Sequence, residues 1–247
     1  MLALFVVLLS LTSCDMGGAT VQSFPRVASA GVADPAYSAQ WALPLISARE
    51  AWGITESTEF NADFEPVVVA VIDTMIDLYH PDLSSNLLVN QGWDFPQDQP
   101  ITDTTGVTGE THGTHVAGII AAVTGNGQDV AGVGNNRVKV LPLRVLDETD
   151  GNTTVDMVIE AVLYASGFST TAGTLASPVS VISMSLGGDN GGFLGVELGE
   201  AISRAEERGV ALVAAVGNAG TERTDYPARY PGVLAVGSVD GTKRISP

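Results

Sequence analysis

The sequence is poor in cysteine, in basic residues and in long hydrophobic runs. Each of these shortages argues against a particular kind of structure or binding partner. Among 247 residues there is one cysteine, Cys14, so neither an internal disulfide nor a cysteine-based zinc cluster can form. With 28 acidic and 11 basic residues the formal net charge is −17, which argues against nucleic acid as a partner because phosphate binding needs clustered Lys and Arg. The apolar run at residues 1–11, interrupted only by Ser10, is too short for a stable membrane-spanning helix.

The first 33 residues have the character of an export segment and a tether. The run at 1–11 suits the apolar region of a signal peptide, and Leu11-Thr12-Ser13-Cys14 is similar to a bacterial lipobox, in which the Cys becomes the lipidated first residue. We therefore expect a signal peptide at 1–14 and an exported protein that Cys14 anchors to a membrane. An ordinary signal peptide with a chance cysteine is the alternative. Residues 15–33 are small and polar, which predicts a tether.

From residue 34 to residue 247 the pattern alternates between buried strands and helices, which predicts one α/β domain. Apolar, β-branched runs that are buried on both faces are typical of parallel sheets covered by helices. The predicted strands are residues 67–73, 138–146, 179–185, 210–216 and 233–239. The predicted helices are residues 114–124, 153–166 and 194–208.

Asp73 and His112 are the first candidates for catalysis. Asp73 ends a run of apolar residues, so its carboxylate is desolvated and needs a partner, unless it only caps the next turn. His112 is followed by Gly113 and opens an apolar helical pattern, as a positioned base would. His115 follows three residues later, and H-x-x-H on a helix is also a spacing for a pair of metal ligands.

Two further polar segments follow predicted strands. Ser185-Leu186-Gly187 comes directly after one strand, and Asn218 lies in G-N-A-G after the next. Each could be a simple turn. The carboxyl ends of parallel strands meet at one edge of the sheet, where ligands bind. We therefore expect Asp73, Ser185 and Asn218 to converge there.

Together these segments resemble the subtilisin-like serine peptidases (peptidase family S8), and most of all the thermitase-like branch. The resemblance rests on V-V-V-A-V-I-D at 67–73, T-H-G-T-H-V-A-G at 111–118 and G-N-A-G at 217–220, in the family's chain order. It implies a three-layer fold with a mostly parallel central sheet. It also implies an endopeptidase in which His112 is the general base, Asp73 orients it and His115 is structural.

The same resemblance assigns roles in substrate binding. Asn218 would donate to the oxyanion. Ser185, Leu186 and Gly187 would pair with an extended protein or peptide substrate and line the pocket for the residue before the scissile bond. Thr74 matches the family, whereas Met75 departs from the glycine usual there. We expect a monomer.

The family's nucleophile motif, G-T-S-M-A, occurs nowhere in these residues. We therefore expect the catalytic serine beyond Pro247, so that the chain as given is C-terminally truncated and inactive by itself. The alternative is a non-catalytic surface lipoprotein that binds extended peptides in the substrate groove.

The resemblance also implies a Ca²⁺ site, which would use some of the many carboxylates. It rests on D-P-A-Y-S-A-Q-W from residue 34, H-P-D-L from residue 80 and V-T-G-N-G-Q-D-V-A-G from residue 123. Six oxygens fit Ca²⁺. They would come from the side chains of Asp34, Asp82 and Asn126 and from the carbonyls of Val123, Gln128 and Val130. A second, weaker site would use Asp94, Asp98 and Asp103.

Overall fold

The computed structural model describes residues 32–56, 65–102, 111–146, 153–188 and 195–246. The predicted signal peptide, Cys14 and the tether up to residue 31 lie outside the described residues. Within the described parts of the chain, no helix combines the length and apolar character needed to cross a membrane.

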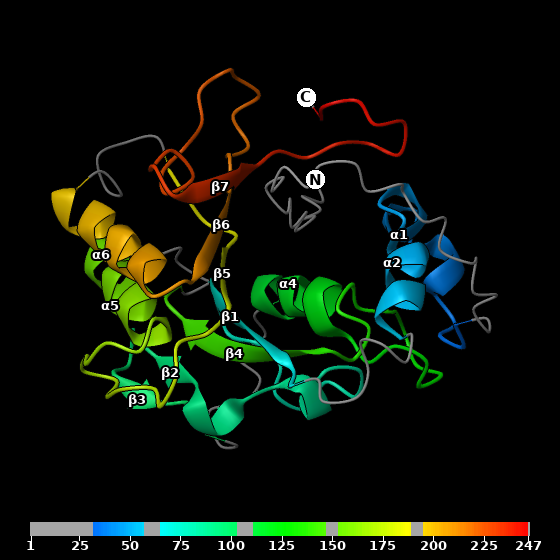
Figure 1. Ribbon diagram of the computed structural model, residues 1–247, viewed down its shortest axis with the longest axis horizontal. Helices are drawn as coiled ribbons and strands as arrows, with labels where there is room; N and C mark the ends of the chain where they lie inside the picture. Colours follow the sequence, from blue (N-terminus) through cyan, green and yellow to red (C-terminus); the bar gives the residue numbers. More distant parts are fainter. Residues whose placement is uncertain (1–31, 57–64, 103–110, 147–152, 189–194, 247) are drawn as a thin grey trace, which may run out of the picture.

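A seven-stranded sheet forms the centre of the domain, with the strand order β3-β2-β4-β1-β5-β6-β7 (Figure 1). Every neighbouring pair is parallel except the short β2–β3 pair. All five predicted strands are present, and β2 and β3 are additional. The strands are β1 (Val67–Asp73), β2 (Trp93–Asp94), β3 (Gln99–Pro100), β4 (Val138–Arg144), β5 (Val181–Met184), β6 (Ala211–Ala215) and β7 (Val233–Val236).

Helices cover the sheet on both faces, which confirms the α/β prediction. α5 (Val155–Ala165) and α6 (Val196–Glu207) pack side by side on one face, and α4 (His112–Ala121) packs on the other (Figure 1). The remaining helical segments are η1 (Tyr37–Ala39), α1 (Ala42–Leu45), α2 (Ala48–Thr55), η2 (Ser84–Asn86) and η3 (Val89–Gln91).

The alternation of side chains along each strand divides the core in two. Ile72 and Met184 face α5 and α6, whereas Val71, Val140 and Val213 face α4. Because successive side chains of a strand point to opposite faces, a strand covered on both sides must be apolar throughout. This explains why continuous apolar runs predicted the central strands correctly.

Candidate active site

A carboxylate and an imidazole meet where β1 ends and α4 begins. Asp73 is the last residue of β1 and is fully buried, and His112 is the first residue of α4. His112 Nδ1 lies 2.6 Å from Asp73 Oδ1, and 49% of the imidazole side chain is exposed. A carboxylate at Nδ1 holds the proton there, so the basic nitrogen of a neutral ring is Nε2. The pair is built like a positioned general base.

The start of α4 is fastened to the end of β1 by two residues. Thr74 donates its backbone N–H to Asp73 Oδ1 over 2.7 Å, and its Oγ1 accepts the N–H of Gly113 over 2.9 Å. A Cβ on Gly113 would lie 2.5 Å from the carbonyl oxygen of Thr74. Only glycine allows the helix to approach this closely. The sequence indicated Thr74 and Gly113 by their place beside Asp73 and His112, but it did not reveal this docking.

Of two neighbours of the pair, the structure places one in the core and one at the surface. Met75 is 2% exposed and belongs to the core on the α4 face, so the departure from the family's glycine places a large apolar side chain inside the domain. His115 lies on the exposed side of α4. This exposure favours a small effect of His115 on stability, and its structural role stays a prediction of the resemblance.

The strand register brings the other predicted segments to the same edge of the sheet. β5 lies between β1 and β6, with Met184 opposite both Ile72 and Ala214. The residues that follow these positions, Asp73 and Ser185, are therefore neighbours at the carboxyl edge. Leu186 is buried and Gly187 is exposed. Asn218 is exposed and lies three residues beyond the end of β6.

Two buried oxygen atoms at this edge have no hydrogen-bond partner, namely Asp73 Oδ2 and Ser185 Oγ. Buried polar atoms are nearly always paired, and exceptions are concentrated at functional sites. One atom lies at the end of β1 and the other just beyond the end of β5. Both therefore lie at the carboxyl edge of the sheet, where the sequence motifs predicted the site.

The predicted calcium ligands also gather in one place. Asp34 is 4% exposed and Asp82 is 0% exposed, although they are far apart in the sequence. Asp34 accepts the N–H groups of Gly125 and Gly127 at 2.8 and 3.1 Å. Asp82 Oδ2 accepts the N–H of Val130 at 3.1 Å. The loop that carries the predicted carbonyl ligands is thus wrapped around two buried carboxylates.

These residues are suited to bind a hard cation, provided that the side-chain amide of Asn126 turns. Each carboxylate oxygen accepts one N–H, and neither acid forms an ion pair with any described residue. The amide of Asn126 donates Nδ2 to Asp82 Oδ1 over 2.8 Å, while its oxygen accepts the N–H of Gln128. The amide must therefore turn before its oxygen can bind a cation. No cluster of three or more His, Cys, Asp or Glu side chains suited to a metal occurs among the described residues, so neutral oxygens would have to complete the shell.

The second, weaker calcium site has no support in the structure. Asp94 is buried and paired with Arg144, with Nη1 3.1 Å from Oδ2. Asp98 is exposed with a φ of 49°, and Asp103 lies outside the described residues. Because a buried carboxylate that already has a cationic partner is neutralised, Asp94 has no need of a metal ion.

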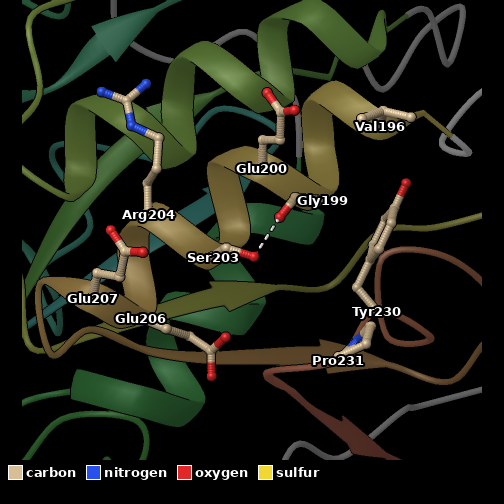
Figure 2. A pocket seen from close by; sticks show the side chains of 9 residues that line it. All are labelled: Val196, Gly199, Glu200, Ser203, Arg204, Glu206, Glu207, Tyr230 and Pro231. Carbon is tan, nitrogen blue, oxygen red and sulfur yellow. Dashed lines mark hydrogen bonds between the residues drawn. The ribbon is translucent and has the colours of Figure 1, made fainter.

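A surface cavity of about 590 Å³ lies over α6 (Figure 2). None of the predicted catalytic, substrate-binding or metal residues lines it. Ser203, one of the lining residues, donates its hydroxyl to the carbonyl of Gly199 within α6, as Figure 2 shows. This cavity is therefore separate from the candidate active site. Its lining consists of Val196, Gly199, Glu200, Ser203, Arg204, Glu206, Glu207, Tyr230 and Pro231.

The sequence and the structure were both compared with known proteins, and the matches reported below are all proteases. The model of the subtilase family (Peptidase_S8) matches residues 65–247. Thermitase of Thermoactinomyces vulgaris is 36% identical over 208 residues, which are 84% of this chain and 65% of thermitase. The major intracellular serine protease of Bacillus subtilis is 37% identical over 188 residues, which are 73% of this chain and 53% of that protein.

A solved protease from Pseudoalteromonas arctica has the same fold, with a TM-score of 0.69 at 31% identity, covering 86% of this chain and 67% of its own. The chain spans less than two thirds of the length of the two curated relatives above.

Proposed function

The chain belongs to the subtilase family, and from this premise we propose that it serves as a serine endopeptidase acting on proteins or peptides. The observation that carries the proposal is the 2.6 Å contact between Asp73 and His112 at the carboxyl edge of the sheet. Asp73 is fully buried, whereas half of the imidazole is accessible. This combination fixes the ring while leaving it within reach of a substrate.

In this proposal the imidazole moves the protons and the carboxylate orients it. His112 accepts the proton of a serine hydroxyl at Nε2 as that oxygen attacks the scissile carbonyl, and later donates the proton to the leaving amine. Asp73 keeps the other proton on Nδ1 and stabilises the transient imidazolium. The N–H of Thr74 donates to the same carboxylate oxygen and so helps to hold the carboxylate in place.

Recognition and oxyanion stabilisation would come from the neighbouring strand ends. The backbone at residues 185–187 would pair with an extended substrate, as an added strand does. The amide of Asn218 would donate to the oxyanion of the tetrahedral intermediate. The nucleophile itself must be a serine, and we propose that a G-T-S-M-A segment outside these 247 residues supplies it, because the family's motif is absent from them.

Activity of two polypeptides tests this proposal. Residues 1–247 alone are expected to leave casein intact, because Asp73 and His112 then have no hydroxyl to activate. The same chain continued through a G-T-S-M-A segment is expected to cleave casein and to be blocked by a serine-directed phosphonate. Phosphonate-sensitive cleavage by residues 1–247 alone would contradict our placement of the nucleophile. Peptide binding by the continued chain, without cleavage, would favour the non-catalytic peptide-binding protein.

We propose in addition that Ca²⁺ binds between Asp34, Asp82 and the loop at 123–130. The ion would have a structural role there. A divalent cation would offset the free-energy cost of burying two carboxylates and would hold the loop to them. The backbone carbonyls of Val123, Gln128 and Val130 would complete the shell, together with the turned amide of Asn126.

Ca²⁺ is accordingly expected to raise the melting temperature. At a hundredfold excess over the dissociation constant, binding to the native state stabilises it by about 2.7 kcal/mol, or roughly 5–10 °C for a chain of this size. Asp82→Ala should abolish most of that gain. Asp129→Asn, on an exposed acidic residue of the same loop, is the matched control and should retain it. A melting temperature that does not change when a chelator removes Ca²⁺ would contradict the proposed site.

We propose that the protein is exported and anchored through Cys14. The support is the lipobox-like segment at 11–14 and the name of one relative, an "Extracellular protease" of Xanthomonas campestris, 36% identical over 234 residues. Incorporation of labelled fatty acid at Cys14 would establish the anchor, and its absence would leave an ordinary signal peptide.

A further inference from the structure

Asp225 is a carboxylate that the sequence analysis did not select and that the catalytic mechanism does not use. It lies in the segment that follows the predicted oxyanion loop, and its side chain is partly buried. Among the described residues its carboxylate accepts no hydrogen bond and forms no ion pair. Its oxygens are not among the fully buried polar atoms of the described residues, so the carboxylate is accessible to a cation from solvent.

The backbone fixes this carboxylate between the two segments that would line the substrate pocket. Asp225 donates its N–H to the carbonyl of Val216 over 2.8 Å, at the start of the loop that carries Asn218. Its side chain lies over Gly217, where a Cβ would collide with Asp225 Oδ2. On this side Asp225 is therefore a neighbour of the predicted oxyanion loop.

On its other side Asp225 borders the segment after β5. Gly188 and the next residue of the Asp225 segment, Tyr226, exchange two backbone hydrogen bonds of 3.0 and 3.1 Å. A Cβ on Gly187 would lie 2.5 Å from the carbonyl oxygen of Tyr226 and 3.6 Å from Cβ of Asp225. The absence of side chains at Gly187 and Gly217 therefore leaves Asp225 as the charged group where the two segments meet.

We propose that Asp225 makes the protein select a basic side chain, Arg or Lys, at the residue before the scissile bond. The proposal deepens the peptidase assignment and rests on it for the identity of the pocket. A guanidinium or ammonium group would give the carboxylate the charge-assisted hydrogen bonds that it lacks, whereas an acidic residue would be repelled. No ion pair joins it to a cation among the described residues, and the Arg229 guanidinium lies over the ring of Tyr226, 5.1 Å from the centroid.

The test is a fluorescence titration with p-aminobenzamidine, a cationic probe that needs no nucleophile, so residues 1–247 can be used directly. The chain is expected to bind the probe, and arginine-containing peptides should compete with it. Asp225→Asn should weaken probe binding about 10- to 100-fold, because a charged hydrogen-bond partner is lost while the shape is kept. Asp225→Glu should retain part of the affinity. Glu222→Gln, at an exposed acid in the same loop, should bind like the unmodified chain.

The outcomes separate this inference from the proposed function. No binding, or equal binding by Asp225→Asn at an unchanged melting temperature, would overturn it. In a proteolytically active form, kcat/KM for an Arg-containing peptide should exceed that for its Leu counterpart, and Asp225→Asn should remove the preference. Active enzyme that prefers Leu would also overturn the inference while leaving the peptidase assignment intact. Asp225-dependent probe binding in a protein that cleaves nothing would support the site and count against the peptidase.

Discussion

Replacing His112 with Ala in the proteolytically active protein is expected to lower kcat by about 10⁶-fold, the scale reported for loss of the base in subtilisin itself, which we adopt here. Without the ring, the candidate site loses the imidazole proposed to take the proton of a serine hydroxyl. The measurement is turnover of a chromogenic peptide, compared with turnover by the unmodified enzyme at the same pH.

His115→Ala is the matched control for this experiment, since both residues lie on α4. Because His115 is exposed, its replacement should change the free energy of unfolding by no more than about 0.5 kcal/mol and should leave kcat essentially unchanged. Equal loss of turnover in both variants, with both folded, would refute the assignment of the base. That result would favour the alternative in which His112 and His115 are a pair of metal ligands.

The second large effect is expected at Gly113, which carries no chemistry. In Gly113→Ala the added Cβ would lie 2.5 Å from the carbonyl oxygen of Thr74 and 3.0 Å from that of Met75. Both are backbone atoms, so α4 must move and carry His112 away from Asp73. A misplacement of 1 Å can cost about 100-fold in rate, and we expect kcat/KM to fall by roughly that factor. Overpacking should also lower the free energy of unfolding by about 1–3 kcal/mol.

Gly118→Ala in the same helix distinguishes this clash from a general effect of alanine. Nothing lies within 4 Å of a Cβ at Gly118. An alanine in a helix interior is favoured over glycine by about 1 kcal/mol, so this variant should melt slightly higher and keep full activity. If Gly113→Ala were as active as Gly118→Ala, the docking of α4 on Thr74 would have no role in positioning His112.

The sequence by itself determined the layers of the domain and the choice of Asp73 and His112 as the candidate catalytic pair. Strands β1, β4, β5 and β6 are buried on both faces, so their apolar runs could be recognised without knowledge of their partners. Asp73 stood out because a carboxylate at the end of such a run needs a partner. The short helices α1 and α2 were not predicted: α2 buries only Ala48 and Trp52, which is too sparse a stripe for a helical pattern.

Only the tertiary structure decided the contacts between residues far apart in the chain. The burial of Asp82 beside a loop more than forty residues later, the pairing of Asp94 with Arg144, and the exposure of His115 all depend on how elements pack. The same is true of Asp225, whose side chain lies over Gly217 because its segment forms a bridge to Gly188. Local patterns report which faces of an element are buried. They carry no information on which distant side chain covers that face, because that choice is made by the packing of the whole domain.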